Sequence, residues 1–252
     1  VVSWEIYPTL PTGLSIDSAT GTISGTPAGT SPISSYTVYA NNTGGSATAV
    51  LTIEILEAPP SSITYVPGSF TLTKGTPLGA VTVTAQGDPV DVWSISPTLP
   101  LGLVFDTTNG QLSGTPTAVS PLTTYTVTAT NNGGSGTATI TIQVNDVAPS
   151  SITYTPNFLE LNKDTQMQTN TPTNQGGDVD TWSISPTLPN GLVFDTSTGS
   201  ISGTPTDVTT QATYTVTGTN TGGSATATVT IVVNDAAPTS IVYNPSSFTL
   251  TL

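Results

Sequence analysis

The chain of 252 residues contains no cysteine, no histidine and no arginine, and its only basic side chains are two lysines. Without cysteine no disulfide can hold the fold, and without histidine and cysteine the His-assisted serine and cysteine nucleophiles are excluded. The net charge of −13 excludes binding to nucleic acid phosphates and to anionic membranes. No apolar run reaches the length of a membrane span. We therefore expect a protein that is not an enzyme and that requires no cofactor.

The sequence is strongly repetitive. Trp4, Trp93 and Trp182 begin three versions of one 24-residue phrase, and each interval between them is 89 residues. A unit of this length can bury its own core, whereas solenoid repeats of about 20 to 50 residues depend on their neighbours. The sequence therefore predicts tandem domains, each folded around its own core.

The repeat is out of phase with the ends of the chain. Val1 aligns with Val90, and Leu252 aligns with Lys74. We expect a stretch of a longer tandem array; alternatively, the C-terminal segment could add as a strand to the first repeat of a neighbouring chain. The predicted domains are a partial repeat without its opening strands over 1–57, complete repeats over 58–146 and 147–235, and the first strand of a further repeat over 236–252.

The last segment of each repeat alternates between apolar and polar residues. In residues 137–144 apolar side chains alternate with threonine and glutamine, and residues 125–129 have the same pattern. Period-two alternation with β-branched residues predicts half-buried antiparallel strands. Between them lies the sequence NNGG at 131–134, whose residues tolerate the positive φ of a tight turn. Short strands at regular spacing, with no sustained period of 3.6, predict an all-β sandwich.

The repeated phrase, WSISPTLPLGLVFDTTNGQLSGTP in the second repeat, consists of residues with folding roles. Trp93 is an inward-facing anchor on a strand that Pro97 ends, because proline has no N–H for the ladder. Leu103 begins a short strand, Asp106 to Gly110 forms a tight turn capped by the Asp side chain, and Leu112 begins the return strand. We interpret the phrase as scaffold rather than as a ligand site.

The pattern GLxFDxxTGxISGTP, followed by YTVTAxN and a terminal alternating strand, resembles the bacterial putative Ig domain family, often called He_PIG. It is also similar to cadherin-like domains of the dystroglycan type. The resemblance covers both complete repeats and the visible part of the first. It implies tandem Ig-like or cadherin-like β-sandwiches on large extracellular proteins, on a microbial cell surface or a virion surface. Tyr36, Tyr125 and Tyr214 resemble the tyrosine corner of Ig-like sandwiches.

Cadherin-like proteins place calcium at domain junctions, so the resemblance implies calcium as a candidate ligand here. Calcium needs six to eight oxygen ligands. The alternative interpretation is that the junction carboxylates cap turns or are solvated, since each junction has three at most and the acidic element expected before the Tyr strand is TAVSPLTT. The candidate ligands are Glu57, Asp88 and Asp91 at the first junction and Asp146, Asp178 and Asp180 at the second.

Three functional hypotheses follow. The first is a non-catalytic stalk or fibre segment of an extracellular or cell-surface protein, spaced by short proline-containing linkers. The second is an adhesin or carbohydrate-binding repeat array, for which Tyr65 and Tyr154 are the aromatic residues that we expect to be most exposed. The third is a self-assembling filament subunit completed by strand addition. Expected partners are other copies of the chain, neighbouring repeats, glycans or host cell-surface proteins, and Asn41 matches the N-glycosylation pattern.

The third repeat departs from the second in one predicted strand. Val81 and Val83 of the second repeat correspond to Asn170 and Pro172 of the third. One interpretation is an altered register in which Met167 and the neighbouring threonines pack into the core instead. The other is an edge or contact surface for another chain, although proline blunts strand pairing.

Overall fold

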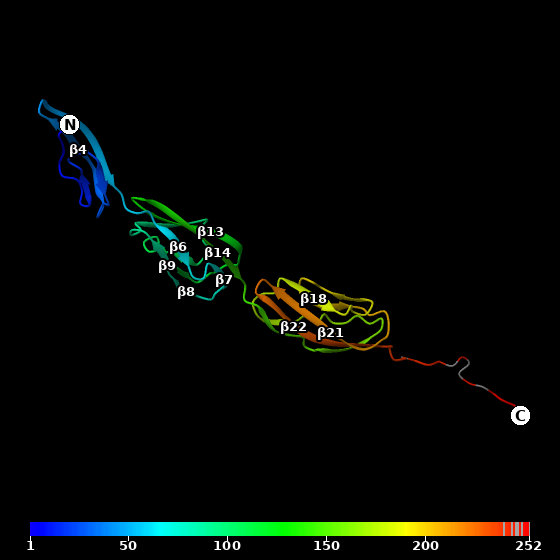
Figure 1. Ribbon diagram of the computed structural model, residues 1–252. Coiled ribbons are helices and arrows are strands. Elements are labelled where there is room, and N and C mark those ends of the chain that lie inside the picture. The colour runs from blue at the N-terminus through cyan, green and yellow to red at the C-terminus, as the bar shows by residue number, and fades with distance from the viewer. Residues whose placement is uncertain (239, 243, 245–246, 248, 252) are drawn as a thin grey trace. The chain divides into compact units, whose positions relative to one another are not determined.

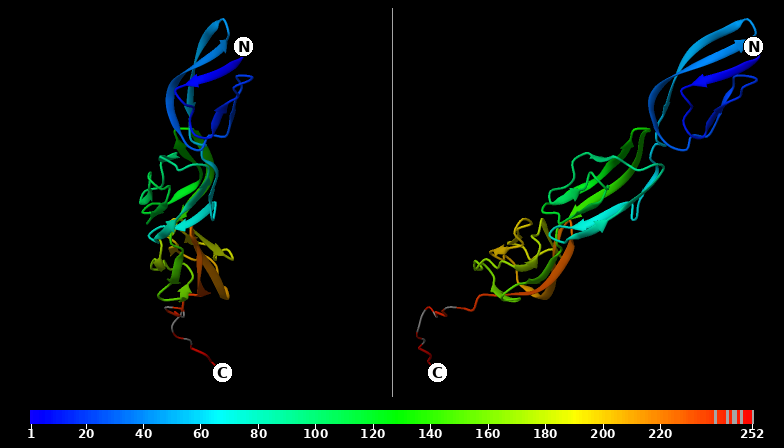
Figure 2. Two further views of the ribbon diagram at one scale, coloured as in Figure 1. Left: turned by 60° about the vertical axis from the view of Figure 1, so that its left-hand side comes forward. Right: turned by 90° about the vertical axis from the view of Figure 1, so that its left-hand side faces the viewer.

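The computed structural model describes residues 1–238, 240–242, 244, 247 and 249–251. All the regular elements in this part of the chain are β-strands, as the sequence predicted (Figures 1 and 2). The chain divides into two compact units, Val1–Val144 with the first two repeats and Asn145–Leu252 with the third. The predicted opening strand over 236–252 falls partly on residues outside the described ones and stays a prediction.

The strands fall into the three repeats. The first repeat has β1 (Ser3–Tyr7), β2 (Leu14–Ile16), β3 (Ile23–Gly25), β4 (Ser31–Asn42) and β5 (Gly45–Ile55). The second has β6 (Ser61–Tyr65), β7 (Ser69–Thr73), β8 (Leu78–Val81), β9 (Val83–Gln86), β10 (Val92–Ser96), β11 (Leu103–Phe105), β12 (Leu112–Gly114), β13 (Ser120–Asn131) and β14 (Gly134–Asn145). The third has β15 (Pro149–Thr153), β16 (Phe158–Asn162), β17 (Thr173–Gly176), β18 (Thr181–Ser185), β19 (Leu192–Phe194), β20 (Ile201–Gly203), β21 (Thr209–Asn220) and β22 (Gly223–Asn234).

The hairpin of β13 and β14 has the register that the alternating pattern predicts. Tyr125 pairs with Ile140 and Asn131 with Gly134, so Asn132 and Gly133 form the turn. The inward residues of both strands are buried, and the threonines between them face outward. This alternation places one face of the sheet in the core and the other in solvent.

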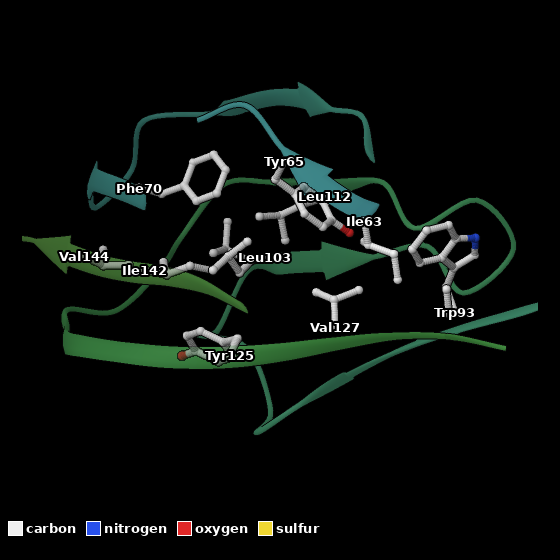
Figure 3. Packing of buried hydrophobic residues seen from close by; sticks show 12 residues of the cluster. Ile63, Tyr65, Phe70, Trp93, Leu103, Leu112, Tyr125, Val127, Ile142 and Val144 are labelled. Atoms are coloured by element: carbon white, nitrogen blue, oxygen red, sulfur yellow. The ribbon is translucent and has the colours of Figure 1, made fainter. Parts of the chain in front are cut away.

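The core of the second repeat lies between two layers of strands. One layer has the order β10-β13-β14-β7, and the other is built from β11-β12-β8 and the pair β6-β9. Figure 3 shows Leu103, Leu112 and Ile142 between the strands, with Trp93 at one end of the core. Complete burial of such aliphatic side chains contributes about 1.5–3 kcal/mol each.

The second strand of each complete repeat joins the sheet beside the last strand. In the third repeat β16 runs parallel to the end of β22, from Phe158 beside Thr230 to Asn162 beside Asn234. In the second repeat β7 occupies the same place beside β14. The sheet β1-β4-β5 of the first repeat has no such strand among the described residues. Its Ile53 is consequently only half-buried, whereas the equivalent Ile142 is fully buried.

The third repeat accommodates its departure by repacking. Met167 is buried in the core, but it takes the place of Leu78 without a change of register. Its N–H donates to the Gly203 carbonyl, and Leu78 pairs with the equivalent Gly114 in the second repeat. The neighbouring threonines stay exposed, so the altered-register interpretation is wrong.

Asn170 is also buried, and its backbone forms an isolated bridge with Ile201. The Asn170 Nδ2 donates to the Pro156 carbonyl at 2.8 Å. The buried amide therefore has a partner, which a core position requires.

Candidate functional site

The repeated phrase builds a tryptophan-capped hairpin. In the second repeat the Gly110 N–H donates to the Asp106 carbonyl at 2.8 Å, and the Trp93 N–H donates to the Thr107 carbonyl at 2.9 Å. Gly110 has φ +72°, and a Cβ built on it would lie 2.8 Å from Trp93 Cδ2. The indole therefore rests directly on the glycine. This arrangement supports the interpretation of the phrase as scaffold.

Tyr65 and Tyr154 belong to the same scaffold, so our expectation that they are exposed is wrong. Only 6% of Tyr65 and 5% of Tyr154 are exposed. The Tyr65 hydroxyl donates to the Gly110 carbonyl at 2.6 Å, and the Tyr154 hydroxyl donates to the Gly199 carbonyl. Burial raises the pKa of Tyr65 to about 12 and also raises the pKa of Tyr154. Neither ring is available as a platform for sugars.

Removing the Tyr154 hydroxyl should destabilise the third repeat without changing its surface. We expect Tyr154→Phe to lower the free energy of unfolding by about 1 kcal/mol, because the buried Gly199 carbonyl loses its donor. For a domain of this size, that corresponds to a fall in Tm of about 4–8 °C. Ser183→Ala, at an exposed position of the same repeat, should leave Tm unchanged. Equal Tm values for Tyr154→Phe and the wild type would contradict this role.

The aspartates of the hairpins are caps, as the sequence predicted. The Ser197 hydroxyl and N–H donate to Asp195 Oδ1 at 2.6 and 2.8 Å. These bonds, that of the Ser197 hydroxyl first, stabilise the carboxylate and lower the pKa of Asp195 to about 2. Thr108 makes the same two bonds to Asp106 and lowers its pKa as well.

The Asp195 cap should make the third repeat sensitive to acid. Its pKa is lower in the folded chain than in the unfolded one, so its contribution to stability is present above about pH 4 and is lost as the pH falls toward 2. We expect Asp195→Ala to be less stable than the wild type at pH 6, with a smaller difference near pH 2. Denaturant unfolding at both pH values measures this, and a difference independent of pH would contradict it.

The predicted calcium ligands of the first junction contact backbone groups. Asp88 Oδ2 accepts a hydrogen bond from the Ala58 N–H at 2.7 Å, and Glu57 Oε2 accepts one from the Asn132 N–H at 3.4 Å. The Asp91 N–H donates to the Thr130 carbonyl. The contacts of the Asp88 and Glu57 carboxylates match the alternative in which the junction carboxylates cap turns.

At the second junction the Asp146 carboxylate makes such a contact, while the contacts of Asp178 and Asp180 involve their backbone groups. Asp146 Oδ1 accepts the Val147 N–H at 2.9 Å, and the Asp180 N–H donates to the Thr219 carbonyl. The Asp178 carbonyl accepts from Asn220. Among the described residues, no group of three or more acidic, histidine or cysteine side chains is placed to hold a metal ion. The calcium assignment therefore stays a prediction, which thermal unfolding in calcium and in chelator would test.

The linkers are held by asparagines of the β13–β14 and β21–β22 turns. Asn131 Nδ2 donates to the Ala58 carbonyl at 2.9 Å, and Asn220 Nδ2 donates to the Val147 carbonyl at 2.7 Å. Both asparagines are buried. The sequence predicts that residues of these turns adopt positive φ, and Gly134 does so with a φ of 144°. Gly133 has a different role, because a Cβ there would lie 1.8 Å from the Glu57 carbonyl oxygen.

Asn41 lies on the outward side of β4. Its Oδ1 accepts the Ser46 hydroxyl at 2.5 Å, and the residue is half-exposed. The side chain is thus at the surface of the sheet, and N-glycosylation there stays a prediction.

The sequence reasoning missed two aromatic residues. Tyr7 is 73% exposed, and Tyr39 is partly exposed on the neighbouring strand. A comparison of the repeats could have identified them, because the equivalent residues of the other two repeats are serine and threonine.

Two layers of strands, with the second strand beside the last one, define each complete repeat as an Ig-like β-sandwich. The chain belongs to the family described as Putative Ig domain, whose profile matches residues 3–56, 59–145 and 148–234. The match confirms both the family resemblance and the tandem repeat.

Curated relatives include the serine-rich adhesin for platelets of Staphylococcus aureus. It is 32% identical over 131 residues, which are 52% of this chain and 6% of the adhesin. The version from strain MRSA252 is 31% identical over 131 residues, covering 52% of this chain and 10% of that protein. The chain thus spans a small part of the curated relatives that it matches.

Similar solved structures include tandem Ig proteins. The I-band fragment I67–I69 of titin aligns over 93% of this chain and 87% of the fragment, with 15% identity and a TM-score of 0.41. The eight N-terminal Ig domains of Down syndrome cell adhesion molecule align over 93% of this chain and 32% of theirs, with 15% identity and a TM-score of 0.48. In the part of the chain that the structure describes, no helix has the length and apolar character needed to cross a bilayer.

Proposed function

We propose that this chain is a non-catalytic, force-bearing stalk segment of a bacterial cell-surface protein, in which the repeats hold another part of the protein away from the cell. The observation that carries this proposal is the parallel pairing of β16, the second strand of the third repeat, with β22, its last strand. A force applied through the chain pulls β16 toward its start and β22 toward its end. The hydrogen bonds between parallel strands are then loaded together in shear, and no single bond opens first.

The linkers support the same function. Strand β14 ends at Asn145, and the next residue already docks on the third repeat, where the Asp146 N–H donates to Thr221 Oγ1 at 2.9 Å. A linker without free residues has little slack. The invariant repeat length of 89 residues then favours regular spacing along the array.

The relatives support a place at the cell surface. The relative from S. aureus is named as an adhesin for platelets, and Ig-like repeats suit an extracellular array. These relatives give no support to a virion surface. We infer that the longer protein contacts host molecules, with this segment as its spacer.

Single-molecule force spectroscopy of the full chain tests the stalk proposal. We expect the third repeat to resist extension strongly, and Leu161→Pro to lower its unfolding force well below that of Leu161→Ala. Both variants lose the leucine, but only proline removes the N–H at a position that pairs with Val233. The second repeat provides the reference force within each molecule. Equal unfolding forces for the two variants would contradict the shear clamp.

Strand addition is a second candidate, favoured by the incomplete sheet of the first repeat. Leu51 and Ile53 on β5 are half-buried, while the equivalent Ile140 and Ile142 are buried. Residues 247–251 have the sequence SFTLT, identical to that of β7. We expect a peptide of residues 236–252 to bind beside β5 and to raise the Tm of the first repeat. A peptide with alternate residues changed to lysine is the control, and equal effects of both would contradict the pairing.

A further inference from the structure

One face of the first repeat differs from the corresponding face of the other two. In the sheet of β1 and β4, Glu5 pairs with Tyr39 and Tyr7 pairs with Thr37. Tyr36 is buried, so its alternating neighbours point to the opposite side, away from the core. We call this outward surface the tyrosine face, and it consists of Glu5, Tyr7, Thr37, Tyr39, Thr48 and Val50.

Four positions of this face differ in character from their counterparts in the other two repeats. The inward residues Ile6 and Val38 are the same in all three repeats. The four outward positions carry only serine or threonine in the second and third repeats, but glutamate, tyrosine or valine in the first. Glu5 replaces Ser94 and Ser183, Tyr7 replaces Ser96 and Ser185, Tyr39 replaces Thr128 and Thr217, and Val50 replaces Thr139 and Thr228.

The sheet does not need these side chains in order to fold. Tyr7 is 73% exposed and Val50 is 69% exposed, although the equivalent serines and threonines support the same strands in the other repeats. Apolar rings gathered on one exposed surface indicate a contact with another molecule. Tyr7 and Tyr39 are diagonal neighbours on adjacent antiparallel strands, a separation of about 7–8 Å at the backbone that long side chains bridge.

We propose that the tyrosine face binds a neutral oligosaccharide. The C–H face of a pyranose ring can lie flat on a tyrosine ring, which removes apolar surface of both from water. The carboxylate of Glu5 can accept hydrogen bonds from sugar hydroxyls, and Thr48 can accept or donate them.

Charge and size select this ligand class. Both lysines, Lys74 and Lys163, lie outside the first repeat, and Glu5 adds a negative charge to the face. An acidic polysaccharide would therefore meet repulsion without a compensating cation. A protein partner needs about 800 Å² of surface on each side with a central cluster of anchors. The face offers two rings and one valine among hydroxyls, which suits a sugar chain of a few units.

The experiment uses the full chain and NMR titration with cellohexaose, chitohexaose and laminarihexaose, with polygalacturonate and hexalysine as charged probes. We expect at least one neutral hexasaccharide to shift signals of the first repeat at millimolar concentration. The double variant Tyr7→Ser, Tyr39→Thr should weaken that binding at least tenfold. Both replacements are the residues of the other repeats, so the sheet should remain folded.

A transplanted face provides the matched control. Ser94→Glu, Ser96→Tyr and Thr128→Tyr together reproduce three positions of the face on the second repeat, and they should create a second site for the same sugar. The proposal is overturned if no neutral hexasaccharide binds, if the double variant binds as well as the wild type, or if hexalysine or polygalacturonate binds more tightly than every neutral sugar. Failure of the stalk function would be seen in the unfolding forces, which these surface variants leave unchanged.

Discussion

Gly110→Ala is expected to lower the free energy of unfolding of the second repeat by about 3 kcal/mol or more. Gly110 has φ +72°, where a residue with a Cβ is strained by about 1–2 kcal/mol. The new Cβ would also lie 2.8 Å from Trp93 Cδ2 and 2.7 Å from Val83 Cγ1. Overpacking of a core commonly costs about 1–3 kcal/mol. Thermal unfolding of the full chain should show the transition of the second repeat lowered by about 12 °C or more.

Gly79→Ala is the control for this prediction. A Cβ at Gly79 meets no atom within 4 Å, and its φ lies outside the left-handed range. We expect its effect on the second repeat to stay within about 0.5 kcal/mol. The third repeat should unfold at its wild-type temperature in both variants. Equal stabilities for Gly110→Ala and Gly79→Ala would show that the tryptophan-capped hairpin does not hold the repeat together.

Asn220→Ala is expected to release the linker of the third repeat. Its Nδ2 donates to the carbonyls of Val147 at 2.7 Å and Asp178 at 2.8 Å, and its Oδ1 accepts the Gly222 N–H at 2.8 Å. The alanine variant leaves these groups without their partner, and each unsatisfied buried group costs about 1–3 kcal/mol. We expect a loss of about 2 kcal/mol or more in unfolding free energy and faster amide exchange at Gly222.

Asn190→Ala is the control for this prediction, because it removes an asparagine that does not contact the linker. Asn190 is exposed, and its Nδ2 donates to Asp207 Oδ2 at the surface. Its replacement should change stability by about 0.5 kcal/mol at most. If Asn220→Ala were no more destabilising than Asn190→Ala, the asparagine would not anchor the linker.

The fold could be predicted because its signals are local. Period-two alternation identified β13 and β14, the NNGG sequence identified their turn, and Pro97 marked the end of β10 at Ser96. The burial of Tyr65 could not be predicted in this way. It depends on contact with a hairpin 45 residues later in the chain, where the Gly110 carbonyl accepts the hydroxyl. The local sequence SITY before a proline favoured exposure, but the acceptor that buries the hydroxyl lies in a distant hairpin.

Two features of the linker and the tyrosine face could not be predicted from local sequence patterns. The role of Gly133 depends on how closely the Glu57 carbonyl approaches it, which no local pattern records. Tyr7 and Tyr39 could have been identified by comparing the repeats position by position. That comparison becomes meaningful only when the strand register shows that both residues share one face.

The most direct test of the stalk is the distance between two repeats. The chain has no cysteine, so Ser94→Cys and Ser183→Cys, at equivalent exposed positions of the second and third repeats, can carry the only two spin labels. Pulsed electron resonance then gives the distribution of distances between them. We expect one narrow distribution that broadens in Asn220→Ala. A broad distribution in the otherwise wild-type chain, unchanged by Asn220→Ala, would contradict a docked linker and a regularly spaced stalk.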